Sequence, residues 1–220
     1  MSDADIRYPM LDLFYQQYLT DENSASFIHA VSRNYTLGSL ERLARYGNRV
    51  TRRAAILAVG FLGEYAENDM MGAALLDSDR AVRLLADHGI RQLWQRQGSV
   101  AQRHAIQQLY RLIAQSRMEE TIDAATSLIE VNPHIGEAWN QRAIAYCAEG
   151  EFEAAIEDCR ETLNCNPFHF PAAMGMAHCC LQLDDAFSAL DSFRLALRIN
   201  PDLDGVRGHI KHLESTLEDG

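Results

Sequence analysis

The chain has 220 residues and a formal net charge of −11, and its 47% hydrophobic content is enough for a packed core. It contains no run of eighteen apolar residues and its first residues are acidic and polar, so we expect neither a membrane span nor a secretory leader. The five cysteines, an odd number, all lie between Cys147 and Cys180, which predicts reduced thiols in a cytoplasmic protein.

The negative charge is concentrated in the second half of the chain. Residues 1–100 carry 11 Arg against 12 Asp and Glu, whereas residues 101–220 carry 9 Arg and Lys against 19 Asp and Glu. An acidic surface repels phosphate backbones. We therefore expect a protein or peptide partner for this half, and nucleic acid is disfavoured.

The N-terminal residues predict three short helices. Pro9 suits the first turn of a helix whose apolar residues recur on one face as far as Tyr18. The polar residues 21–24 offer N-caps for a second helix, and Gly38-Ser39 is expected to open a third.

Two alanine-rich stretches with a common pattern follow, 31 residues apart. Asn48 is placed to cap the first of them, which runs to glycine 63. When Arg83 of the second stretch is superposed on Arg52 of the first, Asp79 falls on Asn48.

This pattern resembles the HEAT family, whose repeats carry an Asp-x-Asp-x-x-Val-Arg string at the start of an inner helix. The match is complete at Asp77–Arg83 and partial at Asn48–Arg52. The resemblance implies that residues 1–100 form HEAT-like helical repeats. It also implies that these aspartates and arginines tie neighbouring repeats together.

An Asn-Pro dipeptide occurs three times in the second half, beginning at Asn132, Asn166 and Asn200, with a constant interval of 34 residues. A fixed period of this length is typical of stacked helical units. Each proline should mark the end of a helix, because it disfavours α conformation in the residue before it. The period predicts three units, over residues 102–135, 136–169 and 170–203.

The middle unit resembles the tetratricopeptide repeat (TPR). The residues that carry the resemblance are Trp139 at position 4, Ala143 at 8, Tyr146 at 11, Gly150 at 15, Phe152 at 17, Ala155 at 20 and Pro167 at 32. Small residues at 8 and 20 let helices touch, aromatic residues fill the gaps, and glycine makes the turn. The third unit keeps the small residues, and the first matches less well.

The resemblance implies an all-α, right-handed solenoid in which residues 101–220 form a TPR domain. An apolar stripe from Leu203 to Leu217 recurs every three or four residues. It predicts a capping helix over 203–217 that seals the open end of the stack.

In TPR proteins the first helices of the repeats line a concave groove that holds a peptide. The resemblance implies that such a groove is lined here by Arg103, Gln107, Tyr110, Asn140, Gln141, Ile144, Met174 and His178. Neutral hydrogen-bonding groups beside apolar ones suit a peptide main chain with apolar side chains. The predicted function is a non-catalytic scaffold or adaptor. The alternative for each of these residues is packing between repeats.

Chaperone-binding TPR domains clamp a terminal carboxylate with basic residues and with asparagine at position 9. Tyr110 and Ile144 stand in place of that asparagine, and Met174 and Gly175 stand where a basic residue is needed. The sequence therefore does not favour an acidic chaperone tail as the ligand.

A dense basic cluster gives the alternative function. Arg42, Arg45, Arg49 and Arg53 could contact an anion or nucleic acid, together with their neighbour Arg52. We favour a solvated face with Arg52 in a structural role, because the aromatic and carboxylate groups of a base-excision site are not evident.

Neither a metal, a cofactor nor an enzyme is expected. Adjacent residues on a helix point about 100° apart, so Cys179 and Cys180 cannot face one ion. No C-x-x-C pair, phosphate-binding glycine loop or nucleophile elbow occurs. The cysteines are predicted to be small buried core residues.

Overall fold

The computed structural model describes residues 9–218, which form thirteen α-helices and one 3-10 helix and contain no strand. The chain divides after Leu93 into two compact units. The predicted domain boundary, after residue 100, lies a short distance beyond this division. Residues 1–8, where no leader is expected, lie outside the described part. No helix in that part is long and apolar enough to cross a membrane.

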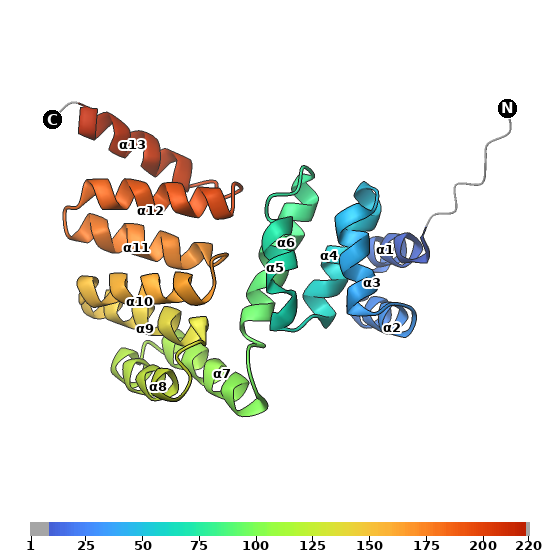
Figure 1. Ribbon diagram of the computed structural model, residues 1–220, viewed down its shortest axis with the longest axis horizontal. Coiled ribbons are helices and arrows are strands. Elements are labelled where there is room, and N and C mark those ends of the chain that lie inside the picture. The colour runs from blue at the N-terminus through green and yellow to red at the C-terminus, as the bar shows by residue number, and fades with distance from the viewer. Residues whose placement is uncertain (1–8, 219–220) are drawn as a thin grey trace, which may run out of the picture. The chain divides into compact units, whose positions relative to one another are not determined.

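The first unit is built around α4. Its elements are α1 (Met10–Asp21), α2 (Ser24–Asn34), α3 (Leu37–Tyr46), α4 (Arg49–Leu62), the 3-10 helix η1 (Tyr65–Glu67), α5 (Asn68–Ala74) and α6 (Arg80–Trp94). The helices α1, α2 and α3 all pack against α4, which buries alanines and Val59 along its length. The blue and green ribbons of Figure 1 show these elements.

The predicted N-caps are present in two of three cases. Asn23 caps α2 and Asn48 caps α4, each by accepting backbone N–H bonds with its side chain. The third helix begins at Leu37, before the predicted Gly38-Ser39, because the Thr36 hydroxyl accepts the N–H of Ser39. A threonine at the N-cap supplies a side-chain oxygen that accepts one of the first free N–H groups of the helix.

Two arginines of α4 are joined to the aspartates that precede α6. Arg52 makes a two-point ion pair with Asp77, with N–O distances of 2.8 and 2.9 Å. Arg53 contacts both carboxylate oxygens of Asp79 at 3.0 and 2.7 Å. Hydrogen bonds from Arg hold the pKa of Asp79 below its usual value, against the effect of burial. The contacts link successive helix pairs, and the HEAT-like character of this unit stays a prediction.

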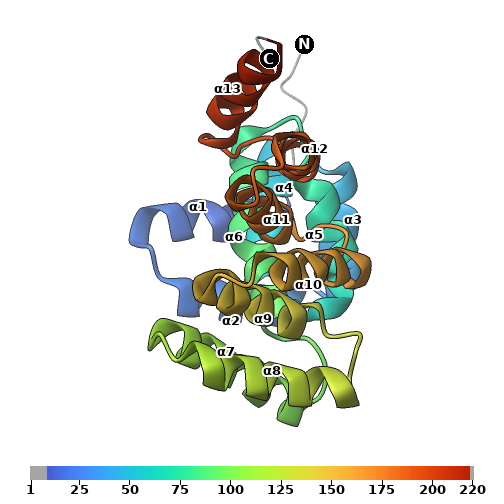
Figure 2. The same ribbon diagram turned by 90° about the vertical axis from the view of Figure 1, so that its left-hand side faces the viewer.

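The second unit is a stack of helix pairs followed by a single helix. Its helices are α7 (Val100–Ala114), α8 (Met118–Val131), α9 (Gly136–Glu149), α10 (Phe152–Cys165), α11 (Phe170–Gln182), α12 (Ala186–Ile199) and α13 (Val206–Glu218). Consecutive helices pack against each other throughout this series. Figures 1 and 2 show α9 to α13 following one another in chain order.

The predicted helix ends of the repeats are confirmed. The three asparagines of the Asn-Pro pairs are the C-cap residues of α8, α10 and α12. Gly150 ends α9 with a φ of 82°, a left-handed conformation that glycine adopts without strain. The alanines at positions 8 and 20 of the last two repeats are buried where the helices touch. The second half is therefore an all-α TPR-type solenoid.

The helix α13 covers the last repeat, as the stripe predicts. Val206 and Leu213 are buried against α12 and the core of α11, and Ile210 and Leu217 pack beside them. The helix therefore removes from water apolar surface that would otherwise be exposed at the end of the stack.

Candidate peptide-binding surface

A broad hollow of about 840 Å³ lies over α7. Its lining residues are Gln95, Ala101, His104, Ala105, Gln107, Gln108, Tyr110 and Arg111. Most of these side chains are neutral hydrogen-bonding groups, and the two alanines leave room between them. Of the eight predicted groove residues, Gln107 and Tyr110 line this hollow.

Sequence reasoning did not select the other lining residues of the hollow. His104, Gln108 and Arg111 are exposed and recur every three or four residues along α7. Such spacing places side chains on one face of a helix. This polar stripe can be recognised in the sequence. It was not predicted as a binding surface, because the TPR pattern assigns the groove to the positions beside it.

Tyr110 is anchored from below by a buried carboxylate. Glu137 of α9 accepts hydrogen bonds from Tyr110 and from the Gln141 amide, the latter at 3.1 Å. Its other oxygen lies 3.1 Å from Nε2 of His169. The Nδ1 atom of His169 accepts the N–H of Ala172, so the ring proton lies on Nε2 and is donated to Glu137.

The carboxylate of Glu137 is stabilised by these donors. Burial by itself raises the pKa of a carboxyl group, but hydrogen bonds from His169, Gln141 and Tyr110 hold the pKa of Glu137 below its ordinary value. Glu137 is therefore a charged, buried anchor beneath the α7 surface.

Trp94 completes this cluster from the other side of the imidazole. Its ring stacks on His169 with a centroid distance of 4.2 Å and an interplanar angle of 26°, and it lies 5.9 Å from the ring of Phe170. Trp94 is the first residue of the second unit and is buried. A tryptophan just before the repeat pattern is the feature of the sequence that indicates this cluster.

The remaining predicted groove residues differ in accessibility. Asn140 and Gln141 are only 7% and 2% exposed, so their side chains do not lie on the surface. The Gln141 oxygen is buried without a hydrogen-bond partner. Ile144 is exposed and Met174 is half-buried. Arg103 is half-buried, with its guanidinium donating to the carbonyl of Gly98.

His178 takes part in a ring cluster at the C-terminal end. Its ring meets Phe193 of α12 edge-on at 5.2 Å and His209 of α13 at 5.7 Å. Partial burial lowers the pKa of His178, and the neighbouring His209 lowers it further. The side chain is exposed, and its ring contacts connect α11 to α13.

The basic cluster of the first unit is largely neutralised by carboxylates. Besides the pairs of Arg52 and Arg53, Arg49 lies 3.6 Å from Asp79 and Arg45 lies 3.6 Å from Glu41. Arg42 is exposed. Paired guanidinium groups offer less attraction to an external phosphate than free ones, so the geometry lends no support to the anion-binding alternative.

Three of the five cysteines are buried in the repeat core, as predicted. Cys159, Cys179 and Cys180 are buried, whereas Cys147 and Cys165 are half-buried, and none forms a disulfide. Burial raises the pKa of Cys159 to about 12, which suppresses its thiolate form. Among the described residues, no three His, Cys, Asp or Glu side chains gather as a metal-binding group would.

Comparison with known proteins places the chain among TPR-type structures. No protein-family model matches it. The chain is 30% identical over 101 residues to a TPR repeat-containing protein of Rhizobium etli. The aligned region covers 46% of this chain and 48% of the relative. The chain thus spans about half the length of the curated relative it matches.

One solved structure shares the fold over about half of this chain. The first TPR of Spaghetti (RPAP3), bound to the HSP90 peptide SRMEEVD, matches with a TM-score of 0.50 and 18% identity, over 53% of this chain and 93% of that one. YrrB, a TPR protein with an unusual peptide-binding site, matches with a TM-score of 0.47 and 15% identity, over 90% and 97% of the two chains.

Proposed function

We propose that the chain is a non-catalytic protein-binding scaffold whose second unit receives a peptide segment of a partner in the hollow over α7. The observation that carries the proposal is the set of neutral hydrogen-bonding side chains around that hollow. Amides of glutamine both donate and accept hydrogen bonds, so they match the alternating N–H and C=O groups of a peptide main chain.

Tyr110 is the proposed specificity residue. Its ring supplies apolar area at the edge of the hollow, and its hydrogen bond to Glu137 limits its motion. A side chain that is already ordered loses less entropy on binding. An apolar side chain of the ligand would pack on this ring.

We propose a neutral, partly apolar segment as the ligand. The RPAP3 domain was solved with SRMEEVD, a peptide rich in carboxylates. The hollow here contains a single arginine, Arg111. Met174 and Gly175 stand where a TPR carboxylate clamp has a basic residue. The peptide SRMEEVD is therefore expected to bind weakly or not at all.

A display library of random peptides, screened on the full chain, tests the proposal. For selected peptides, Gln107→Ala and Tyr110→Ala should together raise the Kd by about tenfold or more, because they remove the hydrogen bonds of the Gln107 amide and the apolar surface of the Tyr110 ring. Gln16→Ala, an exposed glutamine of α1 in the first unit, is the matched control and should leave the Kd unchanged. Circular dichroism checks that helicity is retained.

Two results would contradict the proposal. Selected peptides that bind the double variant as tightly as the natural chain would show that the hollow is not the binding site. Tight binding of SRMEEVD would show that the ligand class is wrong.

A further inference from the structure

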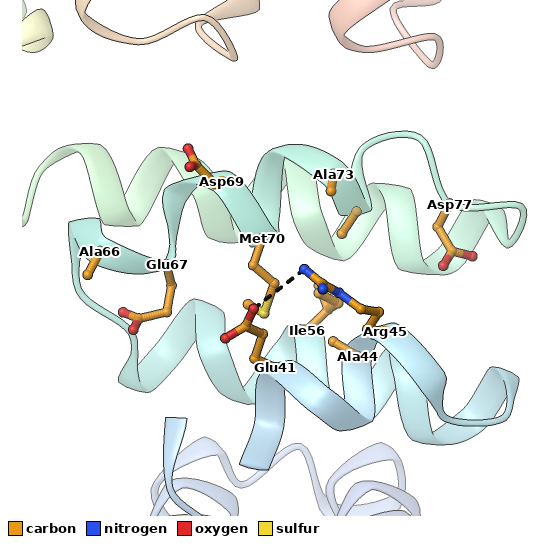
Figure 3. Close-up of a pocket in the computed structure, with 11 residues that line it drawn as sticks. Glu41, Ala44, Arg45, Ile56, Ala66, Glu67, Asp69, Met70, Ala73 and Asp77 are labelled. Carbon is orange, nitrogen blue, oxygen red and sulfur yellow. Dashed lines mark ion pairs between the residues drawn. The ribbon is translucent and has the colours of Figure 1, made fainter. Parts of the chain in front are cut away.

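A groove of about 540 Å³ runs between α3 and α5 in the first unit. Its lining residues are Glu41, Ala44, Arg45, Ile56, Ala66, Glu67, Asp69, Met70, Ala73, Ala74 and Asp77. Figure 3 shows side chains of α3 on one side and of η1 and α5 on the other. Its volume is within the range of sites that bind small ligands or a few inserted side chains.

The floor of the groove is apolar and is formed by small residues and Ile56. Ile56 of α4 is almost fully buried beneath it. Ala44 of α3 and Ala73 of α5 carry only a methyl group, which leaves space between the two helices. Met70 lines the wall with a flexible thioether that can adapt to an inserted side chain. An apolar side chain of a partner would bury this surface.

The rim of the groove is acidic, and its carboxylates differ in whether a neighbouring cation neutralises them. Asp77 lies at one end and is neutralised by the two-point ion pair with Arg52. Glu67 and Asp69 lie toward the other end in Figure 3. Glu67 accepts the N–H of Glu64, which leaves its negative charge in place, and Asp69 is exposed. Negative potential is therefore greatest at the η1 end of the groove.

The only cation among the lining residues is weakly held. Arg45 lies 3.6 Å from Glu41, and the two side chains are 62% and 50% exposed. Exposed ion pairs of this kind contribute little, so a cation of a ligand could displace Arg45 from Glu41 at small cost. This would add a third carboxylate to the binding surface.

We propose that this groove binds an amphipathic segment of a partner protein that carries Lys or Arg beside an apolar residue. The apolar residue would cover Ala44 and Ala73, and the cation would lie at the η1 end of the groove beside Glu67. Charge complementarity selects the ligand, because the lining holds four carboxylates and one guanidinium, and Arg52 neutralises only Asp77 from outside the groove. The site lies in the first unit and takes a cationic segment, whereas the hollow over α7 is proposed to take a neutral one, so it is independent of the proposed function of the second unit.

Three synthetic amphipathic peptides test the proposal on the full chain. They share one apolar face and carry Lys, Gln or Glu at the polar positions, and their binding is measured by fluorescence anisotropy. The Lys peptide should bind at least about tenfold more tightly than the Gln peptide, and the Glu peptide should not bind. The advantage of the Lys peptide should decrease as salt is added.

Variants of the groove locate the bound peptide. Asp69→Lys reverses the charge at the η1 end, and Ala73→Leu fills the floor at an exposed position. Each should weaken binding of the Lys peptide by about tenfold or more. Glu22→Lys is the matched control, since Glu22 is exposed and lies outside the groove. Thermal melting shows whether each variant remains folded.

Three outcomes would overturn the proposal. Equal binding of the Lys and Gln peptides would show that charge does not select the ligand. Unchanged Kd values for both groove variants would show that the peptide is held elsewhere, for example by the acidic second half. If spermidine competes fully at the concentration of the peptide, the groove recognises a small cation and not a protein segment.

Discussion

At the scale of single residues, Glu137 is the most informative position of the second unit. It lies in the first turn of α9, just before the predicted groove residues Asn140 and Gln141. The structure buries it completely and supplies donors from Tyr110, Gln141 and His169. A buried charge is tolerated only when its hydrogen bonds are made, so the residues around Glu137 are constrained as a group.

Glu137→Gln should destabilise the protein at pH 7 by about 1–3 kcal/mol, the cost of a broken buried hydrogen bond to a charged group. The new amide N–H₂ would face the donor group of Gln141 or of His169. Urea unfolding of the two proteins, followed by circular dichroism, measures the difference. A neutral effect at pH 7 would show that the charge of Glu137 contributes nothing to stability.

The same pair of proteins gives a pH prediction. The pKa of Glu137 in the folded chain lies below its ordinary value of 4.5. The unfolded chain therefore takes up the proton first, and the stabilisation is lost as the pH falls from about 4.5 through the lowered pKa. The stability difference between natural chain and variant should shrink over this window. A difference that stays constant down to pH 3 would contradict the assignment.

At the scale of helices, the first unit depends on a close contact between α4 and α6. Gly60 and Gly89 face each other so closely that a Cβ on Gly89 would lie 3.1 Å from the Cα of Gly60. It would also lie 2.4 Å from the terminal methyl of buried Met71. Two glycines thus let two helix backbones approach, and a Cβ on Gly89 requires the buried Met71 side chain to move and the backbones to shift by a few tenths of an ångström.

Gly89→Ala should therefore destabilise the first unit by about 1–3 kcal/mol, although alanine is the better helix former. Gly38→Ala is the matched control, because a Cβ on Gly38 of α3 meets nothing within 4 Å. It should stabilise by about 0.4–1 kcal/mol. Thermal melting measures both. A higher melting temperature for Gly89→Ala would show that α4 and α6 can move apart without loss of stability.

At the scale of the whole molecule, the chain has two compact units, and Trp94 is the first residue of the second. The repeat pattern starts at residue 102, yet the structure extends the second unit back to Trp94. The reason is that residues 94 and 97 contact the repeats directly. The indole buries its area against His169 and Phe170, and Gln97 donates a 3.0 Å hydrogen bond to the carbonyl of His134.

Fragments with different starting points test this division. A fragment of residues 94–220 should unfold cooperatively, and a fragment of residues 101–220 should be less stable by about 3 kcal/mol, typical of losing a buried tryptophan. Trp94→Ala in the longer fragment separates the indole from residues 95–100 and should account for most of the loss. Equal melting of both fragments would place the boundary after residue 100.

Prediction from the sequence succeeded where the signal was periodic and local. The Asn-Pro period places the ends of α8, α10 and α12, and Gly150 ends α9 as expected. These features depend on the conformational limits of proline and glycine, which hold in any context. The start of α3 was misplaced because Thr36, and not Gly38-Ser39, provides the cap.

Prediction of the surfaces was less complete, because accessibility depends on neighbours far away in the chain. The repeat pattern places both Tyr110 and Asn140 on the predicted groove wall. In the structure Tyr110 lines a hollow, whereas Asn140 is buried. The groove between α3 and α5 had no counterpart in the sequence analysis. Its alanines are ordinary helix residues until the distance between the two helices is known.

The sequence by itself determined the all-helical class, the 34-residue period, the helix-ending residues and the uneven distribution of charge. These follow from backbone conformation and composition, which each residue carries with it. Only the tertiary structure decided which polar side chains face water, that Glu137 and His169 form a buried pair, and that small residues of α3 and α5 leave a groove with an acidic rim. The reason is that burial and charge pairing are properties of the packed neighbourhood, and packing brings together residues that the sequence keeps apart.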